Sequence, residues 1–425
     1  MMRIVDGPAR RSNDCEVRRG VDRERSTKPG GFLSIIVQKY GGTSVQDHEK
    51  LLTVARRVTA LRDEGHGVVV VVSAMGSTTD GFLEEARRFT SNPAQRELDM
   101  LITAGERISM SLLAIALNSI GTPAVSFTGS QVGIITDTRH TDARILEVRP
   151  HRVVSELAKG NVVVVGGFQG VSVEKDVTTL GRGGSDTTAV ALAAALQADR
   201  CEILTDVDAV HTADPRIVPD ARRIDEISWE DMTELARFGA RIMKEEAVRF
   251  AERAGIRLHI ARSDGTAPGT IVLERSTHAE PPIVGLSLLD ELVAVLCPAT
   301  KEMRVCDALT FVDPEAVMTI LTCDGLTAIM REPSGEVAVA TPNVPSRSDG
   351  QAARSGMERS RCAVLCAVGR DAGSPATLQT LASTLHESGI GIIAAVSGGR
   401  SVKVVVPGEQ GRIAIGIAHG LLIGN

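Results

Sequence analysis

Aromatic residues are scarce in this 425-residue sequence, with eight Phe, one Tyr and one Trp. Proteins that bind nucleic acids by stacking bases need more aromatic platforms than this. The net charge of −6 likewise argues against a nucleic-acid surface. Because 43% of the residues are hydrophobic, we expect a buried core, and it must consist of Val, Ala, Leu and Ile.

Long apolar runs and paired metal-ligand spacings are also missing. No apolar run reaches the length of a membrane span, so we predict no membrane association. The seven Cys show no metal-ligand spacing, and no HExxH motif occurs, so we predict no protein-held metal site. Structural thiols of this kind are typical of the reducing cytoplasm, which is the predicted location.

Residues 1–33 have no apolar period and are rich in Arg, Asp and Ser. They lack the apolar stretch of a secretory signal. We predict a disordered N-terminal tail there.

Between residues 34 and 273, predicted strands alternate with predicted helices. This order favours an α/β domain with a mostly parallel sheet between helices. Continuous β-branched runs at 68–72 and 162–165 fit strands buried on both faces. The other expected strands are 34–39, 123–127, 132–135, 201–204 and 256–261, and the expected helices are 48–63, 80–90, 97–118, 187–197, 229–238 and 240–254.

The C-terminal part has a different pattern, after a predicted linker at 274–282. We expect an α+β region over 283–425, which is clearest at 362–425 and weaker at 285–344. A Ser/Arg/Gly-rich flexible loop is predicted at 345–361. The expected elements are strand 362–368, helix 374–388, strands 390–396 and 401–406, and helix 409–421, which is most of a βαββαβ unit.

The most informative segment is TTLGRGGSDTT at 178–188, which runs into an apolar, Ala-rich helix. A glycine turn at a helix N-terminus offers backbone N–H groups to an anion. Arg182 adds a planar cation that suits a carboxylate or a phosphate. Asp186 could cap the helix, orient a cation, or hold a lysine. A plain strand–helix turn with an Asp cap is the open alternative.

Other polar clusters follow predicted strands, at 39–44, 73–76, 166–170 and 205–208. Ligands of open α/β sheets bind at the carboxyl ends of the strands, so these clusters are expected on one edge. Lys39 could hold phosphate oxygens; a solvated lysine at a strand end is the alternative.

Two acidic features also leave alternatives open. Glu106, inside an apolar helix, could receive a substrate ammonium or pair with a surface cation. Asp206, Asp208 and Asp214 could bind metal or ribose hydroxyls. Asp-Pro is also an ordinary turn former, so Asp214 is equally well explained by a turn.

Together these segments resemble the signatures of aspartate kinases, a family within the amino-acid kinase superfamily. Seven matching segments occur in family order, and the resemblance covers residues 35–273. They are VQKYGGTS (37–44), SAMG (73–76), LITAGER (101–107), FTGSQ (127–131), GFQG (167–170), TTLGRGGSDTT (178–188) and TDVD through Arg216 (205–216).

The resemblance implies the amino-acid kinase fold and ATP-dependent phosphorylation of the L-aspartate side-chain carboxylate to 4-phospho-L-aspartate. That reaction is the first step of lysine, threonine and methionine biosynthesis. It also implies Mg²⁺ carried with ATP and held largely by phosphates and water. The family carries two C-terminal ACT domains, which bind an amino-acid effector and help to form dimers. We therefore expect a homodimer or a higher homo-oligomer.

The resemblance also implies roles for individual residues. Lys39 would stabilise the transferring phosphoryl group, and Asp186 would organise that lysine and nearby donors. The implied aspartate-binding residues are Ser73, Glu106, Arg182, Gly183, Gly184 and Ser185. The implied ATP-binding residues are Lys39, Tyr40, Gly41, Gly42, Thr205, Asp206, His211, Asp214, Arg216 and Arg241.

The sequence departs from the family pattern in several places. His211 stands where relatives usually have Tyr, and Arg241 stands where they have a Lys near the ATP phosphates. The C-terminal part matches poorly, and the effector segment of the family is not visible. Two alternatives stay open: a kinase of the same fold that acts on another amino acid or on carbamate, and a non-catalytic amino-acid-binding regulatory subunit. Loss of Lys39 or Asp186 would favour the latter, and both are present.

Overall fold

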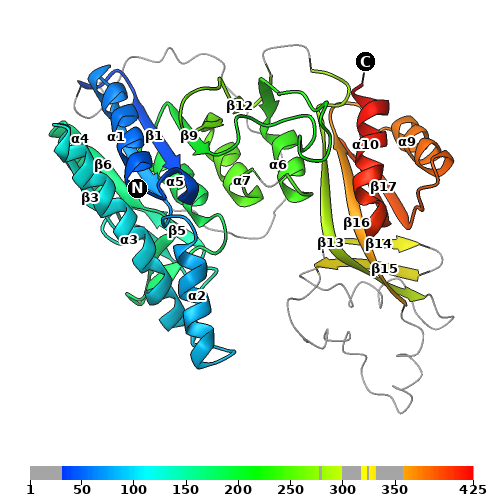
Figure 1. Ribbon diagram of the computed structural model, residues 1–425, viewed down its shortest axis with the longest axis horizontal. Helices are drawn as coiled ribbons and strands as arrows, with labels where there is room; N and C mark the ends of the chain where they lie inside the picture. Colours follow the sequence, from blue (N-terminus) through cyan, green and yellow to red (C-terminus); the bar gives the residue numbers. More distant parts are fainter. Residues whose placement is uncertain are drawn as a thin grey trace, which may run out of the picture. The chain divides into compact units, whose positions relative to one another are not determined.

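The protein was studied as a computed structural model, which describes residues 31–240, 242–276, 280–298, 317–322, 325–331 and 358–424. By its internal contacts the chain forms two compact units. The first unit comprises residues up to 210, together with 225–229 and 242–275. The second comprises 211–224, 230–241 and the residues from 276 onward. Each unit is built on its own main sheet (Figure 1).

The first unit contains an eight-stranded sheet in the order β10-β12-β11-β9-β1-β2-β6-β3. All neighbouring strands are parallel except the antiparallel pair β11 and β12. This agrees with the mostly parallel sheet predicted from the strand–helix alternation. The strands are β1 (Ile35–Tyr40), β2 (Gly67–Val72), β3 (Ala124–Phe127), β6 (Val162–Gly166), β9 (Arg200–Thr205), β10 (Glu226–Ser228), β11 (Leu258–Arg262) and β12 (Thr270–Leu273).

Helices cover both faces of this sheet, as the predicted fold requires. The helix α1 begins where expected because the Asp47 side chain accepts a hydrogen bond from the Lys50 N–H, which caps the helix. The helices of the first unit are α1 (His48–Asp63), α2 (Thr78–Phe89), α3 (Gln95–Ser119), α4 (His151–Ala158), α5 (Gly184–Ala195) and α7 (Glu245–Ala254).

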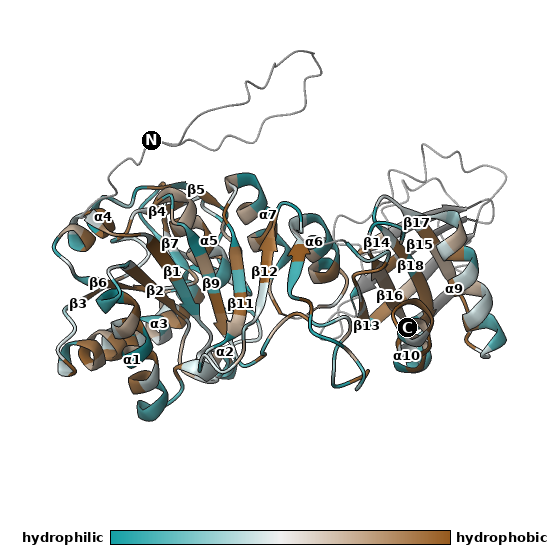
Figure 2. Cartoon of the chain, turned by 90° about the horizontal axis from the view of Figure 1, so that it is seen from above, coloured by the Kyte–Doolittle hydropathy of each residue, from teal (hydrophilic) through white to brown (hydrophobic). Residues whose placement is uncertain are grey.

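The valine run of β2 is the centre of the core. Val68, Val70 and Val72 pack in one cluster with apolar side chains of α1 and α3. Alternation along a strand turns Val69 and Val71 to the opposite face, and α5 packs on β1, β2 and β9. Every residue of β2 is buried, as the continuous β-branched run predicts. Hydrophobic colouring is concentrated on the strands of the sheet in Figure 2.

A second, smaller sheet in the first unit was not expected as a separate layer. It has four strands in the order β5-β4-β7-β8. Its strands are too short to give a clear period in the sequence. They are β4 (Ile134–Thr136), β5 (Ile145–Val148), β7 (Gln169–Ser172) and β8 (Val177–Thr179).

The helix α3 has the length and hydropathy of a membrane-spanning helix. Half of its most apolar window is buried inside the protein, and it also buries Asp99 and Glu106. Packing in the core of this unit therefore accounts for its apolar composition.

The second unit contains a six-stranded antiparallel sheet in the order β14-β15-β13-β16-β18-β17. Its elements after residue 358 follow the predicted order strand, helix, strand, strand, helix. The strands are β13 (Gly285–Pro298), β14 (Met318–Thr322), β15 (Gly325–Arg331), β16 (Glu358–Val368), β17 (Ala394–Gly398) and β18 (Ser401–Pro407). The helices are α6 (Trp229–Arg237, all but its first residue in this unit), α9 (Pro375–Glu387) and α10 (Gly411–Leu422).

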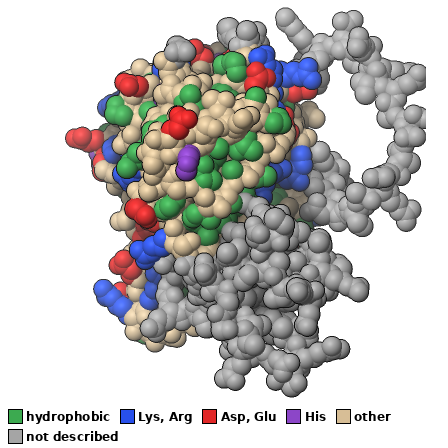
Figure 3. All heavy atoms as spheres, turned by 90° about the vertical axis from the view of Figure 1, so that its right-hand side faces the viewer, with side chains coloured by type: hydrophobic (Ala, Val, Ile, Leu, Met, Phe, Trp, Pro, Cys, Tyr) green, Lys and Arg blue, Asp and Glu red, His purple; other side chains and the backbone are tan. Residues whose placement is uncertain are grey.

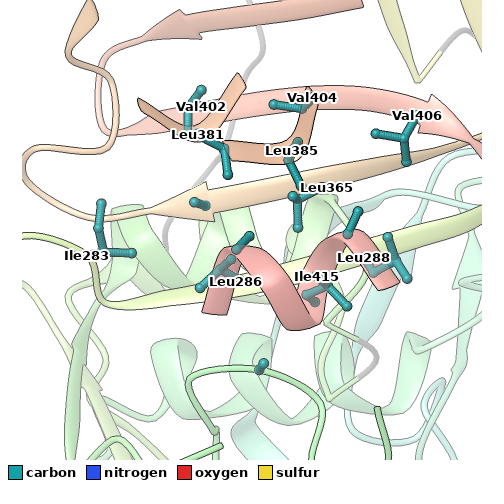
Figure 4. Close-up of a cluster of buried hydrophobic side chains, with 14 of the residues drawn as sticks. Ile283, Leu286, Leu288, Leu365, Leu381, Leu385, Val402, Val404, Val406 and Ile415 are labelled. Carbon is teal, nitrogen blue, oxygen red and sulfur yellow. The ribbon is translucent and has the colours of Figure 1, made fainter. Parts of the chain in front are cut away.

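A hydrophobic cluster joins the strands and helices of this unit. Side chains of β13, β16 and β18 pack against Leu381 and Leu385 of α9 and Ile415 of α10 (Figure 4). On the face drawn in Figure 3, hydrophobic side chains lie among charged groups of both signs. In the coloured part of this view neither sign of charge dominates.

Two segments that we expected in the kinase domain, 211–224 and 230–241, belong to the second unit. Buried polar contacts explain this. Asp231 on α6 forms a two-pronged ion pair with Arg400, at 2.7 and 2.8 Å. Thr212 Oγ1 lies 2.9 Å from His419 Nε2 of α10. Such contacts join distant segments and leave no local pattern in the sequence.

The loop predicted at 345–361 is wrong for its last four residues. Residues 358–361 belong to β16 and pair with β13. Residues 345–357 and 1–30 lie outside the described residues, and so do 299–316 and 332–344 of the weaker C-terminal segment.

The central position of β2 gives a stability prediction. Val70→Ala removes two buried methyl groups from a fully buried site, which should lower the free energy of unfolding by about 2 kcal/mol. The measurement is urea denaturation followed by circular dichroism. Val173→Ala is the matched control, since this side chain is 58% exposed and should change the value by less than about 0.5 kcal/mol. Equal losses in the two variants would contradict the assignment of the core.

Candidate functional site

The carboxyl ends of four neighbouring parallel strands meet at one edge of the main sheet. Tyr40 at the end of β1 is paired with Val72 of β2 and with Leu204 of β9. Val72 is paired in turn with Gly166 of β6. The polar segments that follow these strands are therefore neighbours, as the sequence predicts for a ligand site.

Lys39 and Asp186 form an ion pair at this edge. Lys39 Nζ lies 2.7 Å from Asp186 Oδ1, and the two side chains are only 12% and 9% exposed. Asp186 lies in the first turn of α5, where the helix dipole stabilises a carboxylate. Among the roles left open for Asp186, holding a lysine is the one observed.

The glycine turn before α5 has a backbone that requires glycine. Gly181 and Gly183 have φ of +68° and +69°, in the left-handed region, and Gly183 is the N-cap of α5. A Cβ on Gly184 would lie 2.8 Å from Leu180 Cβ and 3.0 Å from a ring carbon of Phe168. The Gly184 N–H donates to the Gly181 carbonyl oxygen at 3.1 Å within the turn. The turn lies at the positive end of the α5 dipole, which suits an anion.

Glu106 on α3 lies beneath the same edge. It is 3% exposed, and its Oε1 accepts a hydrogen bond from the Ala74 N–H at 3.2 Å. Its Oε2 has no hydrogen-bond partner among the described residues. Burial raises the pKa of Glu106 to about 7, because the charged form is poorly solvated there. A buried carboxyl group with one free oxygen is suited to receive a cation.

Two serines connect β2 with α5. The Ser73 hydroxyl donates to Ser185 Oγ at 3.0 Å, and Ser185 is 7% exposed. Gly167 permits this approach, because a Cβ there would lie 2.8 Å from Ser185 Oγ.

Arg182 is exposed, and no ion pair of its guanidinium occurs within the described part of the chain. Thr205 and Asp206 follow β9, and the Thr205 hydroxyl donates to Asp206 Oδ1 at 2.9 Å. A Cβ on Gly42 would lie 2.5 Å from the Ala74 carbonyl oxygen, and Lys39 Nζ lies 3.8 Å from the Cβ position of Gly41. Both glycines are therefore at the same edge.

Tyr40 does not point toward this edge. Its side chain is fully buried in the core cluster with α1, and its hydroxyl donates to Gln38 Oε1 at 3.2 Å. Alternation along β1 puts Lys39 and Tyr40 on opposite faces, so a side-chain contact of Tyr40 with a nucleotide does not fit the structure. The alternation could have shown this from the sequence.

Three other predicted nucleotide-binding residues, His211, Asp214 and Arg216, lie in the second unit. Arg216 pairs with Asp214 across a short turn at 2.7 Å, which is the turn-forming role left open for Asp214. His211 forms an isolated β-bridge with Arg223. Arg241 lies outside the described residues.

Sequence reasoning missed Lys244, the residue before α7. A Cβ on Gly183 would lie 2.8 Å from Lys244 Cδ, so the lysine stem lies over the glycine turn. It brings a second cation to the N-terminal end of α5. Nothing in the local sequence marks it, because the contact joins two distant segments.

The raised pKa of Glu106 predicts a pH-dependent stability. Between the unfolded pKa of 4.5 and the folded pKa of about 7, the folded protein keeps a proton that the unfolded chain has lost. Stability contributed by this proton is lost as pH rises through that window, up to about 3 kcal/mol. Glu106→Gln removes the ionisation, so it should stabilise the ligand-free protein above pH 7 and have little effect near pH 4.5.

The measurement is thermal denaturation of both proteins at pH 5 and pH 8. A difference in melting temperature that does not depend on pH would contradict this origin of the shift.

The sequence model of the amino acid kinase family matches residues 34–262, which is more than half of the chain. Aspartokinases of Mycolicibacterium smegmatis and Corynebacterium glutamicum are 54% and 52% identical to it over 241 residues. Each alignment covers 56% of this chain and 57% of the relative. The chain thus spans little more than half the length of the curated relatives it matches.

Solved structures give the same family. Aspartate kinase from Synechocystis is 32% identical, with a TM-score of 0.53, over 92% of this chain and 69% of that one. Escherichia coli aspartokinase III in complex with aspartate and ADP has a TM-score of 0.74 at 22% identity, over 91% of this chain and 99% of that one, which is a likeness of fold. From the parallel sheet, the glycine turn and these matches, the chain belongs to the amino acid kinase family.

Proposed function

We propose that the protein is an aspartate kinase, which transfers the γ-phosphoryl group of ATP to the side-chain carboxylate of L-aspartate and gives ADP and 4-phospho-L-aspartate. The observation that carries the proposal is the Lys39–Asp186 ion pair, 2.7 Å long, which follows the glycine turn of α5. The aspartokinase names of the relatives support the choice of substrate. A place at the start of lysine, threonine and methionine biosynthesis is part of the same proposal.

In the proposed reaction, a carboxylate oxygen of aspartate attacks the γ-phosphorus. The bond from that phosphorus to the oxygen shared with the β-phosphate breaks, and ADP leaves with the electron pair. The protein contributes alignment and charge neutralisation rather than covalent chemistry. Lys39 would neutralise charge on the transferring group, and Asp186 would hold its ammonium in place.

Aspartate would be held by groups of opposite charge. Its ammonium would meet Glu106, whose Oε2 has no hydrogen-bond partner in the described part of the chain. Its carboxylates would meet Arg182, Ser185 and the backbone of Gly183 and Gly184 at the start of α5. Ser73 would orient Ser185 through its 3.0 Å hydrogen bond.

ATP would follow the ends of β1 and β9, where Gly41, Gly42, Thr205 and Asp206 lie. His211, Asp214, Arg216 and Arg241 remain proposed contacts on the basis of the resemblance alone. The described residues form no group of three or more possible metal ligands, so Mg²⁺ would be held chiefly by phosphate and water, its usual manner in kinases. It would neutralise phosphate charge.

For the second unit we propose an ACT-like regulatory role. Its strand–helix–strand–strand–helix order after residue 358 supports this. Escherichia coli aspartokinase III has also been solved in complex with lysine and aspartate, with a TM-score of 0.66 to this chain. Binding of an amino-acid effector, a homo-oligomer formed through this unit and a cytoplasmic location complete the proposal.

The direct test is trapping of the acyl phosphate with hydroxylamine. Purified protein with ATP, Mg²⁺ and L-aspartate should give an aspartate-dependent hydroxamate signal. Glutamate and carbamate are the comparison substrates, and turnover of carbamate is measured as release of ADP. Release of ADP with glutamate or carbamate, but not with aspartate, would show that aspartate is the wrong substrate. No turnover with any of the three would favour a non-catalytic regulatory subunit.

Removal of the cation should abolish turnover. Lys39→Ala deletes it, and Lys39→Arg keeps the charge and the pairing with Asp186 while moving the donor. We expect loss of hydroxamate formation by about 100-fold or more in Lys39→Ala and a large loss in Lys39→Arg. Lys159→Ala is the control, since this lysine is exposed and pairs with Glu156. Circular dichroism verifies folding, and full activity of Lys39→Ala would refute the assigned role.

The pKa of Glu106 predicts how aspartate use depends on pH. Only the ionised carboxylate attracts the substrate ammonium, and the pKa of Glu106 in the free protein is about 7. The kcat/KM for aspartate should therefore rise about tenfold per pH unit below pH 7 and level off above it. Glu106→Gln should have a low kcat/KM without this rise. A profile that Glu106→Gln leaves unchanged in shape would contradict the role.

A further inference from the structure

A buried carboxylate outside the proposed chemistry lies under the glycine turn. Asp99 on α3 is fully buried. It accepts hydrogen bonds from the Thr179 hydroxyl at 2.6 Å and from the Thr141 N–H at 3.1 Å, and it lies 2.6 Å from His140 Nδ1. A buried carboxylate costs free energy unless it is well paired, so these contacts must hold it firmly.

The contacts of Asp99 reach a strained backbone. Thr141 has φ of +66°, a conformation that is unfavourable for a β-branched residue. Both carboxylate oxygens of Asp99 accept from its N–H, at 3.1 and 3.2 Å. Strain of this kind persists only where the surroundings fix the residue, and it is common at functional sites.

The strained residue packs on the turn that carries Arg182. A Cβ on Gly181 would lie 2.9 Å from Asp142 Oδ1 and 3.3 Å from the Thr141 carbonyl oxygen. In addition, the Ala143 N–H donates to the Thr179 carbonyl oxygen at 2.8 Å. Asp99 therefore fixes both the strand that leads into the turn and the loop that covers it.

The helix α3 also carries Glu106, about two turns or roughly 10 Å farther along. The helix α3 therefore supports two parts of the proposed aspartate site. It carries Glu106, the proposed receptor for the ammonium, and through the contact of Asp99 with Thr179 it holds the turn that carries Arg182, the proposed receptor for a carboxylate. An amino acid whose ammonium meets Glu106 and whose side-chain carboxylate meets this turn must therefore fit the spacing that α3 sets between them.

We propose that Asp99 is a positioning residue, which fixes the spacing between Glu106 and the Arg182 turn and so selects a four-carbon amino dicarboxylate over one with an extra methylene. This inference rests on the proposed aspartate kinase function. Asp99 touches no reacting group; it acts through Thr179 and Thr141.

The test uses two adjacent threonines of β8 on the full-length protein. Thr179→Val removes the hydroxyl bonded to Asp99, and Thr178→Val removes one bonded to Thr136 at 2.7 Å. Both side chains are fully buried, so both variants lose a buried hydrogen bond. Asp99→Asn is a third variant. The KM for aspartate, the KM for ATP and the ratio of kcat/KM for aspartate over glutamate are measured for each.

We expect Thr179→Val and Asp99→Asn to raise the KM for aspartate and to lower the aspartate-to-glutamate ratio, up to about 100-fold, with little change in the KM for ATP. Thr178→Val should lower stability alone. If Asp99→Asn does not fold, the comparison of the threonine variants decides. Equal effects of the two threonine variants, or an unchanged ratio in Thr179→Val, would overturn the inference. Absence of aspartate turnover in the unaltered protein would instead refute the proposed function.

Discussion

The ion pair between Lys39 and Asp186 is the contact on which the site depends. It joins the end of the central strand β1 to the first turn of α5, and both partners are largely buried. Removing one partner from such a pair leaves an uncompensated charge, which is costly. The pair therefore fixes the position of β1 relative to the glycine turn and the N-terminus of α5.

Two buried acidic side chains on α3 differ in how many of their oxygens are hydrogen-bonded. Asp99 is satisfied on both oxygens by protein groups. Glu106 accepts a hydrogen bond on one oxygen only, and burial raises its pKa to about 7. A satisfied carboxylate stabilises the scaffold, whereas an incomplete one is suited to bind a ligand. Both lie on α3, so scaffold and receptor share one rigid element.

The local patterns predicted most of the first unit. The apolar period predicted helix α1, and the β-branched runs predicted β2 and β6. The four-stranded sheet was missed because strands of three or four residues carry too little periodicity. The glycine turn was recognised because its left-handed backbone demands glycine at 181 and 183. The Tyr40 side chain is buried in the core, so only its backbone is available to the ATP contact that the resemblance implies.

By itself the sequence determined the succession of strands and helices, the chemistry at the ends of the strands and the position of the glycine turn. These depend on residues close together in the chain. Only the tertiary structure decided that Asp186 holds Lys39, that Asp99 supports the turn, that Lys244 lies over Gly183 and that 211–224 packs with the C-terminal unit. Each of these contacts joins segments far apart in sequence. The free energy of a buried polar contact depends on the groups around it in the folded protein, and the order of residues along the chain does not reveal those groups.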